Sequence, residues 1–111
     1  MDEWRDGTRQ YDQPGEHLLG VFAGDELIAI GGLCRDPYAA GSAGRLRRLY
    51  VSPAARRQGV GQKLVKDLLT RGGSSFSSVM LRTDNPIAAA FYERLGFLRV
   101  DQDAATHVLQ L

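Results

Sequence analysis

Apolar residues in this chain fall into short runs, and the spacing within each run predicts strands or helices. Two runs near the N-terminus, residues 17–23 and 27–33, are too short for helices. They are separated by a short polar stretch in which Gly24 and Asp25 suit a tight hairpin turn. We therefore expect two neighbouring antiparallel strands, followed by an exposed connection at residues 35–44.

Four later segments are also predicted as strands. Residues 45–51 and 78–83 contain β-branched or aromatic residues and lie next to serine, glycine or proline. Residues 97–101 and 106–111 close the chain as two short strands. The arginines of the first segment interrupt its alternation, but its length and the Ser-Pro that follows still favour a strand.

Two segments have helical spacing. Between residues 60 and 73, apolar positions recur at intervals of three and four, and a pair of glycines ends the run. The second helix is marked by Asn85 as N-cap, Pro86 as first residue and Gly96 as the left-handed stop. Its predicted inward stripe is formed by Ile87, Phe91 and Leu95.

The predicted order is β-β-β-α-β-α-β-β, which places the chain in the α/β (α+β) class with one mixed, mostly antiparallel sheet. Its only parallel pair joins the strands that flank the first helix, because a crossover helix brings two strands into the same direction. Residues 1–16 are polar and show no period, so they are predicted to be a loop or a remnant of something longer. Residues 17–111 form a single domain.

Composition excludes several classes of function. The net charge of +1 gives no overall attraction to nucleic acid or anionic membranes, and no run approaches the roughly 20 apolar residues of a membrane span. Cys34 is the only cysteine, and with His17 and His107 alone the chain has no zinc-ligand cluster. We expect a cytoplasmic protein without a metal, in which Cys34 is a buried small hydrophobe.

The loop before the first helix has the features of an anion site. The first turn of a helix exposes unpaired N–H groups and carries partial positive charge. Gly59 and Gly61 would let a phosphate approach the backbone closely, and Arg56 and Arg57 could donate to its oxygens. The dinucleotide and nucleoside-triphosphate fingerprints both fail here, because Leu64 replaces the third glycine and no Gly-Lys-Ser/Thr follows.

Two motifs resemble the GNAT N-acetyltransferases. Arg56-x-x-Gly59-x-Gly61 is similar to the family's acyl-coenzyme A motif, R/Q-x-x-G-x-G/A. The segment "NPIAAAFYERLGF", residues 85–97, is similar to the later N-x-x-A-x-x-x-Y motif with its Gly-Phe. They occur in the family's order, each at a predicted strand-to-helix junction, and the resemblance spans residues 18–111.

The resemblance implies a fold and a cofactor site. Two central parallel strands splay apart, and acetyl-coenzyme A lies between them as co-substrate, along the edge at residues 49–51. Its pyrophosphate lies on the amides of residues 57–61, and the splayed partner strand is at residues 79–83. The implied cofactor-binding residues are Leu49, Tyr50, Val51, Arg56, Arg57, Gln58, Gly59, Val60, Gly61, Asn85, Ala88, Phe91 and Tyr92.

The resemblance also implies the reaction, transfer of acetyl to a primary amine by direct attack in a ternary complex. The backbone N–H of Leu49 is the candidate for oxyanion stabilisation and Tyr92 for general acid towards the leaving thiolate. Outside this context Tyr92 reads as an ordinary half-buried tyrosine. Many relatives place an acidic base about where this chain has Arg45, and the remaining candidates are Asp36, Glu26 and Glu93, of which Asp36 is retained as a base candidate.

Three questions stay open. The missing base and the short N-terminal region also suit a catalytically idle acyl-coenzyme A binding module with a regulatory or assembly role. The short region removes the family's usual acceptor wall, which favours a homodimer. The acceptor is a small-molecule or peptide amine of unknown identity.

Since neighbouring strand residues face opposite sides, we expect that Arg45, Arg47 and Arg48 do not form one nucleic-acid-binding patch.

Overall fold

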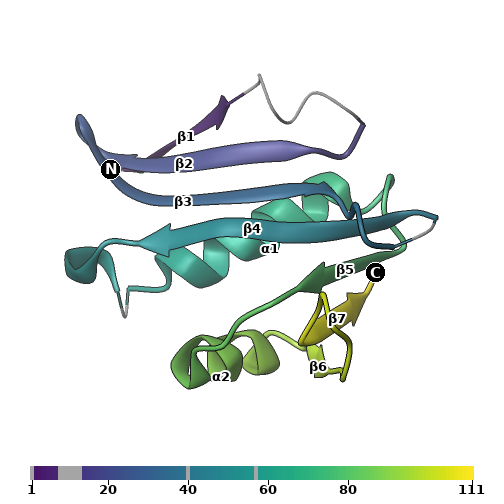
Figure 1. The fold of residues 1–111 in the computed structure, drawn as a ribbon. Helices are drawn as coiled ribbons and strands as arrows, with labels where there is room; N and C mark the ends of the chain where they lie inside the picture. Colours follow the sequence, from purple (N-terminus) through teal and green to yellow (C-terminus); the bar gives the residue numbers. More distant parts are fainter. Residues whose placement is uncertain (1, 8–13, 40, 57) are drawn as a thin grey trace.

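The computed structural model describes residues 2–7, 14–39, 41–56 and 58–111. The described part consists of seven strands, two α-helices and one 3-10 turn (Figure 1). In chain order the elements are β1 (Asp2–Gly7), β2 (His17–Ala23), β3 (Glu26–Arg35), β4 (Ala43–Val51), η1 (Pro53–Ala55), α1 (Val60–Gly72), β5 (Ser78–Leu81), α2 (Pro86–Arg94), β6 (Leu98–Arg99) and β7 (His107–Gln110).

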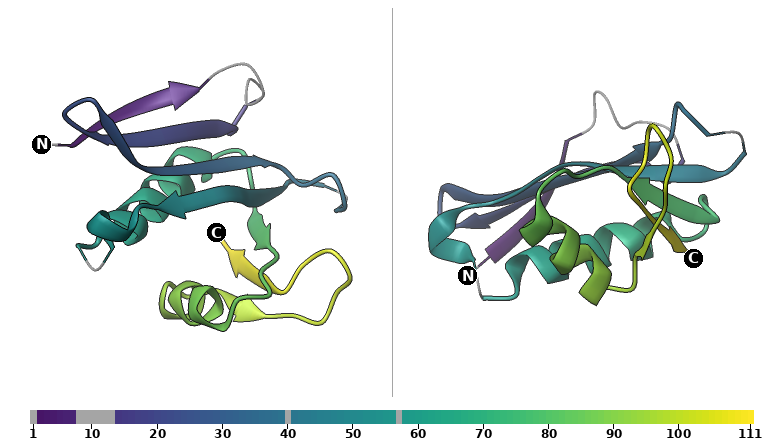
Figure 2. Two further views of the ribbon diagram at one scale, coloured as in Figure 1. Left: turned by 60° about the vertical axis from the view of Figure 1, so that its left-hand side comes forward. Right: turned by 60° about the horizontal axis from the view of Figure 1, so that its bottom comes forward.

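All seven strands form one sheet in the order β1-β2-β3-β4-β5-β7-β6. Every neighbouring pair is antiparallel except β4 and β5, which are parallel and flank α1. The predicted fold class and the single parallel pair are thus confirmed. Figure 2 shows α1 lying across one face of the sheet, while α2 lies beside the C-terminal strands.

The core lies between α1 and the sheet. Leu64, Val65 and Leu68 of α1 are completely buried, as the predicted helical stripe requires. They meet buried side chains of β2 and β3, namely Leu19, Val21, Ala29 and Leu33. Burying this one apolar face of α1 anchors the helix, so the direction of its N-terminus is set by core packing.

Residues 2–7 are a strand, so the prediction of a loop for residues 1–16 is wrong over this stretch. β1 pairs antiparallel with β2, from Asp2 opposite Ala23 to Gly7 opposite Leu18. Residues 8–13 lie outside the described residues. The polar stretch has no alternation that would mark a strand, and it forms one because backbone groups at the edge of β2 offer hydrogen-bond partners.

The second helix begins and ends as predicted, but its inward face differs. Ile87 is 80% exposed, whereas Ala89 and Tyr92 are buried. α2 meets β7 through Glu93 and His107, and this tertiary contact decides which residues of the helix face inward. The three-residue stripe predicted from apolar spacing therefore missed Tyr92. Strand β5 also ends two residues earlier than the predicted boundary, at Leu81.

Strand β4 contains a β-bulge at its centre. Tyr50 lies opposite Ile30 and Arg47 opposite Gly32, so Gly31 alone faces the two residues Arg48 and Leu49. Arg48 has φ 59, in the left-handed region. A Cβ on Gly31 would lie 3.0 Å from the Leu49 side chain, so glycine makes room for the bulge.

Candidate active site

The two parallel strands separate soon after they meet. β4 and β5 pair only over residues 43–45 of β4, opposite residues 78–80 of β5. Beyond this point residues 46–51 of β4 have no strand partner on the β5 side within the described chain. The result is the splayed pair that the sequence motifs imply.

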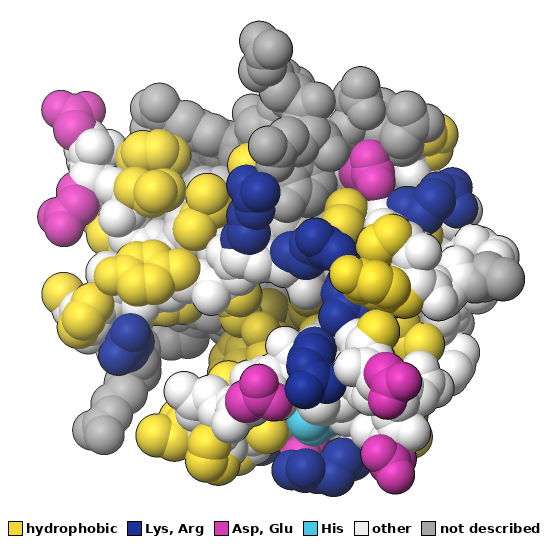
Figure 3. Space-filling model, in the orientation of Figure 1, with side chains coloured by type: hydrophobic (Ala, Val, Ile, Leu, Met, Phe, Trp, Pro, Cys, Tyr) yellow, Lys and Arg dark blue, Asp and Glu magenta, His cyan; other side chains and the backbone are white. Residues whose placement is uncertain are grey.

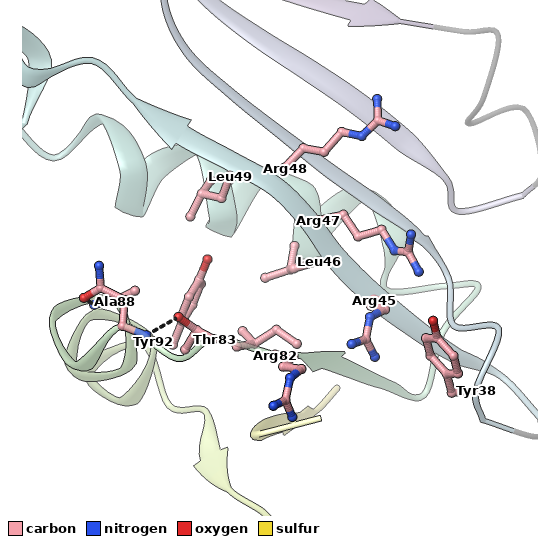
Figure 4. A pocket seen from close by; sticks show the side chains of 12 residues that line it. Tyr38, Arg45, Leu46, Arg47, Arg48, Leu49, Arg82, Thr83, Ala88 and Tyr92 are labelled. Atoms are coloured by element: carbon pink, nitrogen blue, oxygen red, sulfur yellow. Dashed lines mark hydrogen bonds between the residues drawn. The ribbon is translucent and has the colours of Figure 1, made fainter. Parts of the chain in front are cut away.

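A cavity of about 650 Å³ occupies the place where the strands diverge. Figure 4 shows side chains from β4, from the segment after β5 and from α2 converging on this cleft. Its lining residues are Tyr38, Arg45, Leu46, Arg47, Arg48, Leu49, Leu81, Arg82, Thr83, Asn85, Ala88 and Tyr92. Of the predicted site residues, the cleft therefore brings together Leu49, Asn85, Ala88 and Tyr92.

Tyr92 stands at the side of the cleft formed by α2. Its ring packs edge-on against Phe91 at 5.2 Å and Phe97 at 5.6 Å between centroids, and 7% of the residue is exposed. Figure 4 shows the hydroxyl directed across the cleft towards β4. Burial raises the pKa of Tyr92 to about 12, because the phenolate would lose hydration. The group therefore keeps its proton throughout the neutral and mildly alkaline range.

Asn85 is the N-cap of α2, as predicted. Its Oδ1 accepts hydrogen bonds from the N–H groups of Ile87, at 2.8 Å, and Ala88, at 3.3 Å. Its own N–H donates to Thr83 Oγ1 at 3.2 Å. These bonds hold the start of α2 at the cleft and so set where Tyr92 lies, two turns further along.

A partly buried chain of polar groups joins α2 to β7. His107 on β7 is 1% exposed, and its Nε2 lies 2.8 Å from Glu93 Oε2, while its Nδ1 lies 2.9 Å from Thr106 Oγ1. Thr106 Oγ1 also accepts from the N–H of Thr83 at 3.0 Å. The hydrogen bond to His107 lowers the pKa of Glu93, with Arg99 adding to the effect. Sequence reasoning missed this network, because its members are joined only by the fold.

The N-terminus of α1 is open, as an anion site requires. Gly59 is the N-cap with φ 76, and no side chain caps the helix. The N–H of Lys63 donates the first helical hydrogen bond, to the carbonyl of Gly59 at 3.0 Å. The N–H groups of the three residues before Lys63 therefore have no helical acceptor. A Cβ on Gly61 would lie 3.2 Å from Val51 and 3.5 Å from Phe91, so this glycine keeps α1 close to β4 and α2.

The side chains of the loop before α1 have other partners. Arg56 Nε donates to the carbonyl of Val51 at 3.0 Å, and Gln58 Nε2 donates to that of Ala54 at 3.0 Å. Arg57, also predicted to contact the cofactor, lies outside the described residues. Several other predicted cofactor-binding residues do not line the described cleft and lie around it or at the start of α1: Tyr50, Val51, Arg56, Gln58, Gly59, Val60, Gly61 and Phe91.

The carboxylate proposed as a base does not reach the cleft. Asp36 is 3% exposed, and its Oδ2 lies 3.4 Å from Arg45 Nη1, while Oδ1 accepts from the N–H of Tyr38. Glu26 lies at the exposed start of β3, and Glu93 faces His107. The structure thus places no carboxylate among the described residues that line the cleft.

Four arginines line the cleft instead, and this feature was not predicted. Arg45, Arg47 and Arg48 come from β4 and Arg82 from the segment after β5. The expectation that the β4 arginines cannot share a patch is wrong, because the bulge breaks the alternation of side chains along β4. Figure 3 shows Lys and Arg side chains running down this face of the molecule between hydrophobic areas.

The cleft opens between two splayed strands and has the glycine-bounded N-terminus of α1 on one side. Known proteins of one family resemble this chain. The profile described as the Acetyltransferase (GNAT) family matches residues 1–97. The chain belongs to this family. N-alpha-acetyltransferase RimI of Mycobacterium tuberculosis is 33% identical over 95 residues, which are 84% of this GNAT chain and 59% of RimI. Mycothiol acetyltransferase of Clavibacter sepedonicus is 33% identical over 111 residues, 96% of the chain and 35% of that protein.

Solved structures agree on the GNAT fold. A proposed acetyltransferase of Exiguobacterium sp. 255-15 has a TM-score of 0.84 at 27% identity, covering 91% of this chain and 66% of that one. PaiA N-acetyltransferase of Thermoplasma acidophilum, solved in complex with coenzyme A, has a TM-score of 0.64 at 23% identity, covering 82% and 57%. The GNAT chain spans about one third to three fifths of the length of the two curated relatives.

Two features are absent from the described residues. No group of three or more His, Cys, Asp or Glu side chains in this part of the chain is arranged to hold a metal ion. Across the same residues, no helix has the length and apolar character needed to cross a membrane.

Proposed function

We propose that this chain transfers an acetyl group from acetyl-coenzyme A to a primary amine, by direct attack within a ternary complex. The observation that carries the proposal is the divergence of β4 from β5 after residue 45, which leaves an unpaired strand edge beside the hydroxyl of Tyr92. Buried or cleft-facing backbone groups need hydrogen-bond partners, and the amides of a pantetheine arm are suitable ones.

The direction of the β4 backbone supports this arrangement. Ser52 donates its N–H to Ile28 of β3 at 2.8 Å. Since N–H groups alternate sides along a regular strand, that of Val51, which lies beyond the bulge, points away from β3, towards the open edge. The uncapped amides at the start of α1 then receive the pyrophosphate, where the helix dipole favours negative charge.

The chemical step balances without an acyl-enzyme. The amine nitrogen forms a bond to the thioester carbonyl carbon, and the carbonyl oxygen becomes an oxyanion that the Leu49 N–H stabilises. The carbon–sulfur bond then breaks and the electron pair leaves on sulfur, which takes the Tyr92 proton. The proton released by the amine passes to water in the open cleft and returns to Tyr92 after the thiol leaves. Cys34 takes no part.

The raised pKa keeps Tyr92 protonated but also makes it a weaker acid. At a pKa of about 12 the phenol is always protonated when the thioester binds, so it can donate a hydrogen bond from the start. An ordinary thiol has a pKa of about 8.5, which makes full proton transfer uphill in water. A thiolate that forms in the partly desolvated surroundings of Tyr92 also has a raised pKa, and this narrows the difference between the two groups.

A second candidate function has one observation in its favour. Because no carboxylate lines the described cleft, a binding module that holds acyl-coenzyme A without turning it over is the alternative. Such a module would bind the cofactor at the same strand edge and use the complex for regulation or assembly. The two functions differ in whether free thiol is released when an amine is added.

The test combines cofactor binding with thiol release. Calorimetry should show coenzyme A binding, and a thiol-sensitive dye should show turnover of acetyl-coenzyme A with at least one member of a primary-amine panel. Gly61→Asp places a carboxylate at the proposed pyrophosphate site and should weaken coenzyme A binding. Thr70→Asp adds the same charge at the other end of α1 and serves as the control. Binding without thiol release on any amine would support the idle module, and the absence of binding would refute both functions.

A further inference from the structure

We propose that the cleft selects an acceptor amine that also carries an anionic group, a carboxylate or a phosphate, and that Arg47, Arg48 and Arg82 bind this group. The inference rests on the proposed acetyl transfer and names the class of acceptor. It is carried by the convergence of four arginines on one cleft that has no acidic side chain among its described lining residues.

The bulge in β4 creates the cluster. In a regular strand Arg47 and Arg48 would point to opposite faces of the sheet. Here two residues of β4 face the single Gly31, and Arg48 adopts φ 59, so both arginines border the same cleft. Figure 4 shows the three arginines of β4 following one another along the strand, with Arg45 directed towards Arg82 and Arg48 extending over the neighbouring strands.

The four arginines differ in how their charge is balanced. Arg45 is buried, pairs with Asp36, donates to the carbonyl of Ala104 and stacks over the ring of Tyr38 at 5.1 Å. The charge of Arg45 is therefore balanced inside the protein, and its buried side chain supports the cluster of arginines.

The other three arginines are exposed, and only Arg82 among them has hydrogen-bond or ion-pair partners in the described chain. Arg82 is exposed, donates to the carbonyl of Asp103 at 3.0 Å and lies 3.5 Å from the highly exposed Asp84. Arg47 and Arg48 are exposed, and neither side chain forms an ion pair or hydrogen bond with any other described residue. A chain with a net charge of only +1 thus concentrates positive charge at one site.

This cluster lies too far from the proposed pyrophosphate site to serve the cofactor phosphates. Arg47 is four residues before Val51, a span of roughly 13 Å along a strand, and α1 begins beyond η1. The cluster borders the acyl end of the cleft near Leu49, where the acceptor must enter. A simple polyamine or a basic peptide would be repelled there, whereas an anion on the acceptor gains paired guanidinium hydrogen bonds.

The experiment measures acceptor binding directly, so it does not depend on turnover. In the presence of saturating coenzyme A, calorimetry compares phosphoethanolamine with ethanolamine, and β-alanine with its amide. We expect at least one anionic amine to bind about tenfold or more tightly than its neutral partner, as hydrogen bonds to charged groups allow. The two pairs distinguish phosphate from carboxylate.

Variants test whether the arginines of the cleft cause the preference for an anionic amine. The double change Arg47→Ala and Arg48→Ala should remove the preference, while Arg94→Ala, which deletes an exposed arginine of α2 away from the cleft, should retain it. Equal binding within both pairs would overturn the proposal, as would binding to neither member of either pair. A double variant that loses coenzyme A affinity and keeps the preference would also overturn it, since the arginines would then serve the cofactor. Acetyl transfer that proceeds equally with neutral amines would leave the proposed reaction intact and reject only the anionic acceptor.

Discussion

The hydroxyl of Tyr92 offers the sharpest test of the site, because Tyr92→Phe removes one oxygen and keeps the packing. The ring contacts with Phe91 and Phe97 do not involve the hydroxyl. No described residue forms a hydrogen bond with it, so the change leaves no partner unsatisfied. We expect the free energy of unfolding at pH 8 to change by less than about 1 kcal/mol.

The effect on turnover should be much larger. A positioned general acid contributes roughly 10² to 10⁴ in rate, which corresponds to about 3–5 kcal/mol of transition-state stabilisation. Coenzyme A affinity should change little, because the hydroxyl acts on the sulfur only as the carbon–sulfur bond breaks. A thiol-release assay gives kcat, and calorimetry gives the affinity.

Alkaline stability gives an independent check of the environment of Tyr92. Its pKa rises from an ordinary 10 to about 12 in the folded protein, a difference of two units. The stabilisation is fully present below pH 10, where folded and unfolded chains both hold the proton, and is lost as the pH rises through 12. At pH 11 the wild type should have lost about 1.4 kcal/mol from this group, and the Tyr92→Phe variant none of it.

Urea unfolding of both proteins at pH 8 and pH 11 measures this difference. If the two proteins lost the same free energy between these pH values, the burial of the hydroxyl would not hold its pKa high. Unchanged kcat in the variant would remove Tyr92 from the mechanism, whatever the result of the unfolding experiment.

Three further predictions concern the surroundings of the cleft. Arg45→Met leaves Asp36 buried without its partner and should lower the free energy of unfolding by about 3–5 kcal/mol, whereas adding Asp36→Leu should recover much of the loss in urea titrations. Gly44→Ala places a Cβ 2.9 Å from the ring of Phe76, and overpacking should lower the thermal midpoint through a loss of about 1–3 kcal/mol; an unchanged midpoint would show that the ring moves freely. The lowered pKa of Glu93 adds stability that is present above its ordinary value of 4.5 and lost as the pH falls through the folded value, so Glu93→Gln should flatten the acid limb of the stability curve measured by urea unfolding. If the acid limb of the Glu93→Gln variant were as steep as that of the wild type, the stabilising role of the lowered Glu93 pKa would be contradicted.

Local signals in the chain predicted the elements that hold the site. The Asn85-Pro86 start and the Gly96 stop of α2 depend on backbone hydrogen bonds and dihedral angles within a few residues, so they could be read directly. The same holds for the hairpin turn at Gly24 and for the apolar stripe of α1. The motifs at residues 56–61 and 85–97 added the resemblance to the GNAT family, and that resemblance implied the splayed strand pair.

Contacts between distant segments decided the rest. β1 exists because the edge of β2 pairs with a polar stretch that has no strand pattern of its own. Asp36 became the partner of Arg45, and His107 became the support of Glu93, through side chains that meet only after the sheet has formed.

The features of the cleft also divide into those that the sequence predicted and those that tertiary contacts decided. The resemblance of two local motifs to a known family was enough to place Tyr92 and the strand edge at Leu49 in one predicted site. The bulge opposite Gly31, which turns the β4 arginines towards one cleft, arises from the pairing of two strands and their packing on α1. The identity of a single residue cannot specify such a register shift, because it is settled by the combined fit of backbone hydrogen bonds and core side chains from three elements.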